Sequence, residues 1–289
     1  MTAIAIVGLG IMGSAMAHNL LGSGHDVSGT DVSPERRDEL TAAGGRAATT
    51  VAAAISGVDA VITSLPSPEA ALAVSEELSR AGHEGLVVVE TSTLSPQTKQ
   101  DCHDILARAN IVMLDCPLSG TGAQARERDL VVLGSGDEAA FEAVRPALEA
   151  IARSVRHLGP FGNGTITKLV ANLLVSIHNA STAEAFALGV RAGLDPQQLY
   201  DTVREGAGGS VIFDKRGPLM IDRTYLPATA RVSMFLKDVA LVQELASSVG
   251  VQTPVLDATL PLYEAAAAAG HGDEDAAALL EVLDRRSSR

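Results

Sequence analysis

Near its start the chain reads Ala3-Ile-Ala-Ile-Val-Gly-Leu-Gly-Ile-Met-Gly13-Ser-Ala-Met-Ala-His-Asn-Leu20, which passes from a strand-like to a helix-like pattern. Five small or apolar residues predict a buried strand, and Gly8, Gly10 and Gly13 follow with the spacing G-x-G-x-x-G. Gly8 permits a tight turn, Gly10 lets a pyrophosphate approach the backbone, and Gly13 lets the helix pack closely on the strand. The free N–H groups at the start of the helix attract the anion. The residues that we expect to bind a dinucleotide here are Gly8, Leu9, Gly10, Ile11, Met12 and Gly13.

An acidic residue follows at the distance that this type of site requires. Asp26–Asp31 is the predicted second strand, and it places the Asp31 carboxylate where it can accept hydrogen bonds from an adenosine ribose. A carboxylate there repels the 2′-phosphate of NADP, so NAD is the expected cofactor. NADP stays an alternative because Arg36 and Arg37 are near in sequence, although we expect both in the exposed first turn of a helix after Pro34. The competing interpretation is a strand–turn–helix whose turn carries an incidental acid.

Composition limits the class of protein. The 289 residues suffice for two domains with sizeable cores, and the net charge of −13 argues against nucleic acid or an anionic membrane as a main partner. Cys102 and Cys116 have no metal-ligand spacing and form no disulfide framework, which fits a reducing cytoplasm. No signal peptide and no membrane-spanning apolar stretch is expected. The sequence therefore predicts a soluble, cytoplasmic protein without a metal site.

Strands alternate with helix-like segments through the first half of the chain. This rhythm is typical of an α/β Rossmann domain, whose mostly parallel sheet is covered by helices on both faces. The further predicted strands are Ala60–Leu65, Leu86–Glu90, Ile111–Asp115, Asp129–Gly134 and Ser154–Leu158. Leu65 and Pro66 end a strand, and the carboxyl ends of parallel strands lie beside the cofactor crevice, so we expect both to contact the cofactor. Ordinary turn chemistry is the alternative for Pro66.

The second half of the chain is helical in pattern. Apolar residues recur at helical spacing from about Gly164 towards Leu188, which predicts one long helix inside an all-α domain. Later helices are expected to begin near Pro196, Phe235 and Pro254. A breaker-rich turn precedes the long helix. We therefore expect a NAD-binding domain over residues 1–160 and an all-helical substrate and dimerisation domain over residues 161–289.

Lys168 and Asn172 share one face of the predicted long helix, because they are four residues apart. Their neighbours are apolar, and such surroundings would lower the pKa of an ammonium group. A lysine placed in this way can exchange a proton with a substrate oxygen, with Asn172 fixing its position. The alternative is a surface lysine whose stem lies on apolar neighbours.

A third segment, Asp115–Gly122, follows an apolar strand. Its residues Ser119, Gly120 and Thr121 expose hydroxyl and backbone N–H groups that can hold a small carboxylate. A plain flexible loop is the alternative.

Taken in this order, the segments resemble the β-hydroxyacid dehydrogenases, a family that contains 3-hydroxyisobutyrate dehydrogenase and tartronate semialdehyde reductase and is related to 6-phosphogluconate dehydrogenase. The resemblance extends from residue 3 to about residue 283. The matching segments are Gly8–Gly13, Glu90–Thr93, Asp115–Gly120, Gly162–Asn172 and Leu236–Asp238. It implies a Rossmann domain joined to an all-helical domain, an active site between them, and a homodimer or homotetramer.

The resemblance also implies roles for individual residues. Lys168 would be the catalytic acid/base, and Thr93 and Lys237 would lie beside the nicotinamide. Ser119, Gly120 and Asn172 would bind the substrate, with Thr121 in the same loop. The implied activity is NAD(P)-dependent interconversion of a small β-hydroxy acid and its semialdehyde or keto acid.

Two departures from the family pattern concern the substrate loop. Thr121 stands where many members have a second glycine, and Arg128-Asp129 replaces a common Gly-Thr. We expect Arg128 and Asp129 to form an exposed ion pair without a role.

Three other functions share parts of this pattern. Imine or ketimine reductases have the same architecture but usually carry Asp or Tyr where this chain has Lys168. A decarboxylating relative acting on a sugar-acid phosphate would be much longer. A catalytically silent NAD-binding module is the third, and the presence of Lys168, Asn172 and Lys237 argues against it.

Overall fold

The computed structural model describes residues 3–286. Residues 1–2 and 287–289, at the outer ends of the two predicted domains, lie outside the described residues. The chain divides into two compact units, Met1–Lys168 and Leu169–Arg289. Helix α8 (Asn163–Arg191) carries the chain from one unit into the other.

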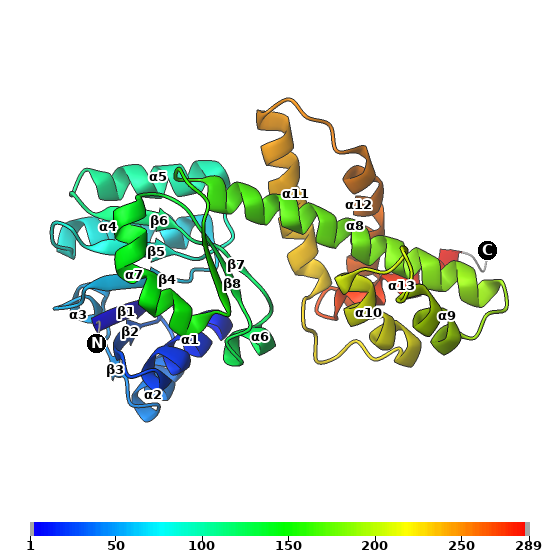
Figure 1. Ribbon diagram of the computed structural model, residues 1–289, viewed down its shortest axis with the longest axis horizontal. Helices are drawn as coiled ribbons and strands as arrows, with labels where there is room; N and C mark the ends of the chain where they lie inside the picture. The colour runs from blue at the N-terminus through cyan, green and yellow to red at the C-terminus, as the bar shows by residue number, and fades with distance from the viewer. Residues whose placement is uncertain (1–2, 287–289) are drawn as a thin grey trace. The chain divides into compact units, whose positions relative to one another are not determined.

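The first unit contains strands and helices in alternation (Figure 1). Its strands are β1 (Ala3–Val7), β2 (Asp26–Thr30), β3 (Arg46–Ala47), β4 (Ala60–Thr63), β5 (Val87–Glu90), β6 (Val112–Asp115), β7 (Leu118–Ser119), β8 (Val131–Gly134) and β9 (Ser154–His157). Its helices are α1 (Ile11–Gly22), α2 (Pro34–Ala42), α3 (Val51–Ala54), α4 (Pro68–Ala81), α5 (Pro96–Ala107), α6 (Gly122–Arg126) and α7 (Glu138–Ile151).

Six strands form a parallel sheet in the order β3-β2-β1-β4-β5-β6. The order in which successive strands are added to the sheet reverses at β1, which pairs with β2 on one side and with β4 on the other. Ile4 of β1 lies opposite Val27 of β2 and Ala60 of β4. In an open parallel sheet this reversal point is where the crevice for a ligand forms, outside the carboxyl ends of the strands. The predicted α/β Rossmann class is confirmed.

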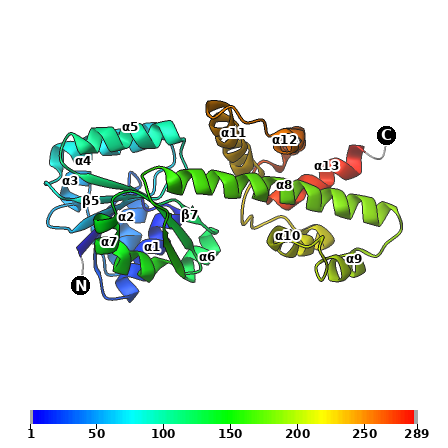
Figure 2. The same ribbon diagram turned by 45° about the horizontal axis from the view of Figure 1, so that its top comes forward.

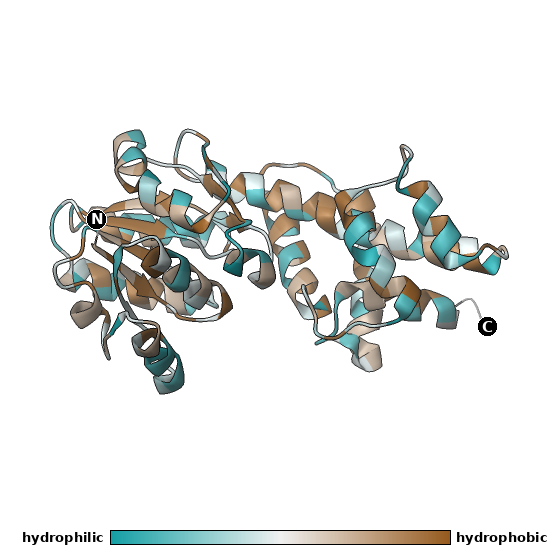
Figure 3. Ribbon diagram, turned by 60° about the horizontal axis from the view of Figure 1, so that its bottom comes forward, coloured by the Kyte–Doolittle hydropathy of each residue, from teal (hydrophilic) through white to brown (hydrophobic). Residues whose placement is uncertain are grey.

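The alternation of side chains along β1 explains the two covered faces of the sheet. Ile4 and Ile6 point into a core shared with α1, α2 and α7, whereas Ala5 and Val7 point into a core shared with α3, α4 and α5. The helices lie on both sides of the sheet when it is viewed from two directions (Figures 1 and 2). The strands between them are hydrophobic (Figure 3). A strand buried on both faces needs such an unbroken apolar run.

The last two predicted strands form, but not in the main sheet. β8 and β9 pair in parallel with each other, and β8 pairs antiparallel with β7 in a separate three-stranded sheet. An antiparallel bridge between Asp115 and Ser135 joins the end of β6 to the end of β8. The two-residue strands β3 and β7 were not predicted, because two residues are too short to show an alternating pattern.

The described part of the second unit is helical, as predicted. It begins within α8 and continues with α9 (Pro196–Val203), α10 (Val211–Asp222), α11 (Val232–Ser248), α12 (Pro254–Ala266), the π-helix η1 (Ala267–His271), the 3-10 helix η2 (Ala276–Ala278) and α13 (Leu279–Arg286). Its main core surrounds two groups of stacked rings, Phe186–Phe213–Tyr200 and Phe235–Tyr263.

The helices of the described residues bear on whether the chain could cross a lipid bilayer. None is both long enough and apolar enough to cross a membrane.

Candidate cofactor and substrate site

The glycine-rich turn is shaped by packing at two of its three glycines. Gly8 has a φ of +94°, and a Cβ there would lie 2.2 Å from the carbonyl oxygen of Ser64. A Cβ on Gly13 would lie 1.9 Å from the carbonyl oxygen of Gly8. At Gly10, by contrast, the nearest described atom is Arg36 Nη1 at 3.5 Å. The fold therefore requires the outer two glycines, while the middle one leaves its backbone open to a ligand, as a dinucleotide turn needs.

Helix α1 begins differently from the other helices of the first unit. Its N-cap is Gly10, which has no side chain to cap the helix, and its first turn contains no acidic residue. Helices α2 to α7 each have a capping side chain: Ser33, Thr50, Ser67, Ser95, Thr121 and Asp137. Among α1 to α7, α1 is thus the helix whose first N–H groups meet no capping side chain, which leaves them available to an anion such as a pyrophosphate.

Asp31 lies directly after β2 and is tied to this turn. Its Oδ2 accepts a hydrogen bond from the Leu9 N–H at 2.7 Å, and its Oδ1 accepts one from the Ser33 N–H at 2.9 Å. Arg36 Nη1 lies 3.3 Å from Oδ2. Burial raises the pKa of Asp31, but the hydrogen bonds from Ser33, Leu9 and Arg36 outweigh it and leave that pKa below its usual value. The residue therefore presents a carboxylate.

The two arginines near Asp31 lie in the first turn of α2, as predicted. Arg37 donates to the Asp31 carbonyl oxygen at 2.6 Å, so both arginines contact Asp31. A cavity of about 520 Å³ opens beside the turn and is lined by Gly10, Ser14 and Arg36, among others. Ser14, which the sequence analysis did not single out, donates to the Leu9 carbonyl oxygen at 2.6 Å.

The predicted residues Leu65, Pro66 and Thr93 follow β4 and β5 at the carboxyl edge of the sheet. The Leu65 N–H donates to Ser92 Oγ at 2.8 Å, which links the two loops. Pro66 is exposed, and Leu65 and Thr93 are half-buried. Because Ser64 also contacts the glycine turn, the structure brings these segments together at the edge where a cofactor would lie.

The predicted substrate loop lies against the same edge. Ser119 ends β7, and Gly120 has a φ of +144° with its Cβ position 2.5 Å from Leu130 Cδ2. A Cβ on Gly122 would lie 2.4 Å from Ile11 Cγ2, so the loop packs closely on the first residue of α1. The loop and the glycine turn are therefore neighbours.

The departures from the family pattern have a structural explanation. Thr121 caps α6 in a capping box with Gln124, so its hydroxyl has a partner inside the protein. Arg128 has a φ of +57°, a conformation that favours the glycine common at this position. Asp129 accepts a hydrogen bond from Gln124 at 2.7 Å and forms a salt bridge with Arg153 at 2.6 Å. Asp129 thus has Gln124 and Arg153 as partners, and the expected Arg128–Asp129 ion pair stays a prediction.

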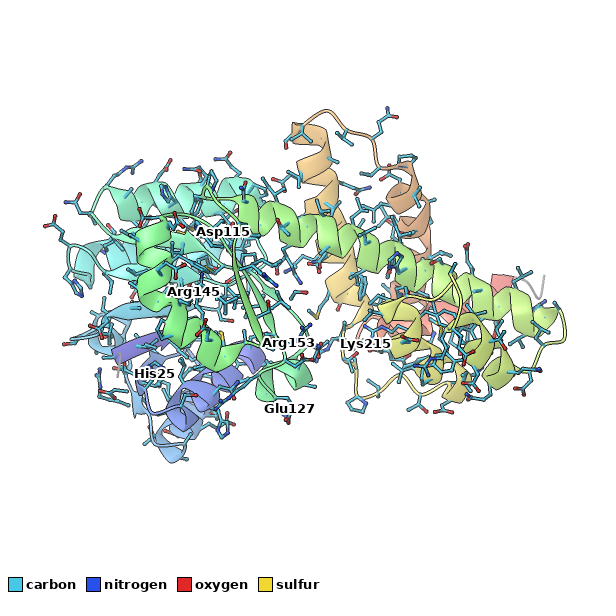
Figure 4. The ribbon with its side chains drawn as sticks, in the orientation of Figure 1. His25, Asp115, Glu127, Arg145, Arg153 and Lys215 are labelled. Atoms are coloured by element: carbon cyan, nitrogen blue, oxygen red, sulfur yellow. The ribbon has the colours of Figure 1, made fainter. Side chains whose placement is uncertain are left out.

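The first turn of α8 is anchored within the first unit. The Gly164 N–H donates to Ser135 Oγ at 2.9 Å, and Thr165 donates from its N–H and its hydroxyl to the Asp115 carboxylate, both at 2.7 Å. Asp115 is seen at the start of α8 in Figure 4. Lys168 follows three residues after Thr165 and is half-buried. Asp115 and Ser135 were not among the predicted site residues, although Asp115 lies in the segment that carries the substrate loop.

Further predicted residues lie in the second unit. Asn172 is 7% exposed and donates to Asp238 Oδ2 at 2.9 Å, and Lys237 Nζ lies 3.8 Å from Asp238 Oδ1. Asp238 thus joins the two candidates, and its place next to Lys237 was the signal that could have identified it. Asn172 is one helical turn after Lys168 on α8.

Comparison with known proteins agrees with this arrangement. Residues 3–159 match the family described as the NAD binding domain of 6-phosphogluconate dehydrogenase. Residues 162–283 match the family described as "NAD-binding of NADP-dependent 3-hydroxyisobutyrate dehydrogenase".

Individual relatives are similar over nearly the whole chain. The L-threonate dehydrogenase of Pectobacterium atrosepticum is 33% identical over 287 residues, which are 98% of this chain and 94% of the relative. The NAD-dependent L-serine dehydrogenase of Pseudomonas aeruginosa is 33% identical over 293 residues, 98% of each chain. The structure of Mycobacterium tuberculosis 3-hydroxyisobutyrate dehydrogenase with L-serine superposes with a TM-score of 0.91 at 28% identity, covering 98% of this chain and 99% of that one.

The matches cover both units, and the glycine turn, Asp31 and the Lys168 helix are all present. The cofactor is therefore a nicotinamide dinucleotide, and the reaction class is oxidoreduction of a small hydroxy acid. This chain belongs to the β-hydroxyacid dehydrogenase family.

Proposed function

We propose that this dehydrogenase transfers a hydride between a small β-hydroxy acid and NAD, with Lys168 as the general acid/base. The observation that carries the proposal is the position of Lys168. It follows directly after a helix turn that Asp115 and Ser135 hold, and Asn172 follows one turn later. A catalytic proton carrier needs such a rigid support.

The proposed chemistry separates the two hydrogens of the alcohol. During oxidation the neutral amine of Lys168 accepts the proton of the substrate hydroxyl as the C–H bond delivers its electron pair and hydrogen as hydride. During reduction Lys168 as an ammonium returns the proton to the carbonyl oxygen. The nicotinamide ring, when bound, supplies the hydride chemistry at its C4 atom. The residues of the chain orient the reactants and move the proton.

Substrate binding is assigned to groups from two segments. We place the carboxylate or hydroxyl of the acid against Ser119, Gly120 and Asn172, because they offer hydroxyl, backbone N–H and amide donors. Thr121 is given a supporting part, since its hydroxyl caps α6. Thr93 and Lys237 are assigned to the nicotinamide end of the cofactor.

For the cofactor we propose a preference for NAD over NADP. The Asp31 carboxylate is held at the glycine turn and is ionised, so it repels a 2′-phosphate and accepts hydrogen bonds from a free ribose. Arg36 is engaged with that carboxylate. The Michaelis constants for NAD and NADP test this point, and a strong preference for NADP would overturn it.

The substrate proposal follows the chemistry of the named relatives. These are called L-threonate, L-serine and 3-hydroxyisobutyrate dehydrogenases, and all three substrates are short acids with a hydroxyl group. We therefore propose an acid of three or four carbons. We also propose that the enzyme works in the cytoplasm as a homodimer or homotetramer, which size-exclusion chromatography with light scattering would test.

The substrate is tested with a panel of 3-hydroxyisobutyrate, glycerate, L-serine, L-threonate and 4-hydroxybutyrate, followed by the absorbance of the reduced cofactor. The proposal expects turnover of at least one 3-hydroxy acid in the panel. Turnover of a cyclic imine with no activity on any acid would support an imine reductase instead. Cofactor binding without turnover of either class would support a silent NAD-binding module.

A further inference from the structure

Lys99 is an ammonium group buried between two carboxylates in the first unit. The residue is 0% exposed, and its Nζ lies 3.1 Å from Asp115 Oδ1 and 3.6 Å from Glu90 Oε1. It also donates to the Glu90 carbonyl oxygen at 3.1 Å. Burial lowers the pKa of Lys99, but the charges of Asp115 and Glu90 outweigh it and leave that pKa above its usual value. The group is therefore charged.

Glu90 connects Lys99 to the loops at the cofactor edge. It ends β5, and its Oε1 accepts a hydrogen bond from the Ser92 N–H at 2.5 Å. Its other oxygen accepts a hydrogen bond from the hydroxyl of Thr63, the last residue of β4. Ser92 in turn accepts from the Leu65 N–H. One carboxylate thus fixes the starts of both loops, the second of which carries the candidate cofactor residue Thr93.

Asp115 connects Lys99 to the helix that carries the proposed acid/base. It ends β6, and both of its oxygens accept hydrogen bonds from Thr165 in the first turn of α8. A Cβ on Gly164 would lie 2.6 Å from the Asp115 carbonyl oxygen, so the helix start and the strand end are in close contact. Any shift of Asp115 would move this turn, and Lys168 is three residues further on.

The two carboxylates depend on the same cation. Without Lys99 both carboxylates would be buried with no cation between them, and the electrostatic cost of that arrangement would displace them from their hydrogen-bond partners. The arrangement around Glu90 and the arrangement around Asp115 would then change together.

We propose that Lys99 is a positioning residue of this dehydrogenase, which neutralises Glu90 and Asp115 and so fixes the Thr93 loop and the Lys168 helix in one arrangement. Lys99 itself touches no substrate. This inference rests on the proposed function of Lys168, and it assigns different effects to the two carboxylates. Loss of the Glu90 contacts weakens cofactor binding, loss of the Asp115 contacts slows turnover, and loss of Lys99 does both.

The test compares three variants with controls in the second unit. Lys99→Met should lower kcat about 100-fold and raise the Kd for NAD about tenfold, since small misplacements of catalytic groups cost rates of this order. Thr165→Val should lower kcat about tenfold with an unchanged Kd for NAD. Glu90→Gln should raise the Kd for NAD about tenfold with a smaller change in kcat. The controls are Arg216→Met, which removes another buried cation, and Thr259→Val, which removes another buried hydroxyl.

The readouts separate positioning from simple loss of stability. Calorimetric titration gives the Kd for NAD, and kcat is divided by the folded fraction from circular dichroism. Hydrogen exchange in the ligand-free protein should be faster in the first turn of α8 for Lys99→Met than for Arg216→Met. If Lys99→Met does not fold, Thr165→Val and Glu90→Gln carry the test through their opposite effects on kcat and Kd.

Two results would overturn the proposal. One is a Lys99→Met protein whose kcat and Kd per folded molecule match those of Arg216→Met. The other is a Thr165→Val protein no slower than Thr259→Val. If the wild-type protein oxidises no hydroxy acid, the proposed function fails by itself, while hydrogen exchange and the Kd for NAD still decide whether Lys99 holds the two segments.

Discussion

Each unit of the chain buries a cation against acidic side chains, but the two clusters hold different kinds of segment. In the first unit Lys99 serves Glu90 and Asp115, which hold a loop and a helix that carry candidate site residues. In the second unit Arg216 pairs with Asp275 at 3.2 Å.

The contacts of Asp275 show what the second cluster does. Its Oδ2 accepts hydrogen bonds from the N–H and the hydroxyl of Thr229, and its Oδ1 accepts one from the Ala277 N–H at 3.1 Å. These contacts tie the loop before α11 to η2, and none involves a predicted site residue. A buried cation paired with carboxylates therefore stabilises the fold in the second unit, whereas in the first unit we propose that it positions catalytic groups.

The largest effect is expected when the group that the first cluster supports is removed. Lys168→Ala should lower kcat by about 10²- to 10⁴-fold, because the reaction then lacks its general acid/base. Steady-state kinetics on the best acid of the panel measures the loss, and titration with NAD serves as the control because binding should be retained. Wild-type turnover in this variant with NAD binding intact would remove Lys168 from the mechanism.

Removing the cation of the second cluster should affect stability and leave chemistry alone. Arg216→Met leaves Asp275 buried without its cation, so the free energy of unfolding should fall by about 3–5 kcal/mol. Urea denaturation measures this change, and kcat per folded molecule should equal that of the wild type. A kcat that falls as it does in Lys99→Met would erase the distinction between the two clusters.

The glycine turn offers a matched pair within the first unit. Gly13→Ala places a Cβ against the Gly8 carbonyl oxygen and should lower the free energy of unfolding by about 1–3 kcal/mol. In Gly10→Ala the new Cβ would lie 3.5 Å from Arg36 Nη1, which is ordinary contact. The free energy of unfolding should therefore change by less than about 0.5 kcal/mol. The Kd for NAD should nevertheless rise about tenfold in Gly10→Ala. Equal losses of stability in the two variants would mean that Gly10 is a packing residue.

The smallest effect concerns the charge of Asp31. Folding lowers the pKa of this carboxyl, so its contribution to stability is complete above the unfolded pKa of about 3.9 and is lost as the pH falls through the folded value. The difference in unfolding free energy between the wild type and Asp31→Asn should therefore be constant from about pH 7 to about pH 5 and shrink as the pH falls below about 4. Urea denaturation of the ligand-free proteins checks this, and a difference independent of pH would contradict it.

Local patterns made the first unit largely predictable. The glycine spacing, the apolar strands and Asp31 can each be recognised from residues that are adjacent in sequence. The long helix from Asn163 was likewise predictable, because its apolar residues recur at helical spacing. Helices α9 and α12 begin at Pro196 and Pro254, as predicted.

Contacts over long sequence distances were not predictable in the same way. Lys99 lies in a helix between polar neighbours and looks like a surface lysine, and only the meeting of β5, β6 and α5 buries it. The partners of Asp115 on α8 are 50 residues away. The separate sheet of β7, β8 and β9 was missed for the related reason that β7 has only two residues.

Chemical rescue by a small amine shows whether Lys168 moves the proton of the substrate hydroxyl. Turnover of Lys168→Ala at saturating NAD and hydroxy acid would be measured with increasing concentrations of a small primary amine. If Lys168 carries the proton, kcat of Lys168→Ala should rise with the concentration of the neutral amine, while wild-type kcat should not change. A Lys168→Ala rate that stays the same at every amine concentration and every pH would contradict the claim.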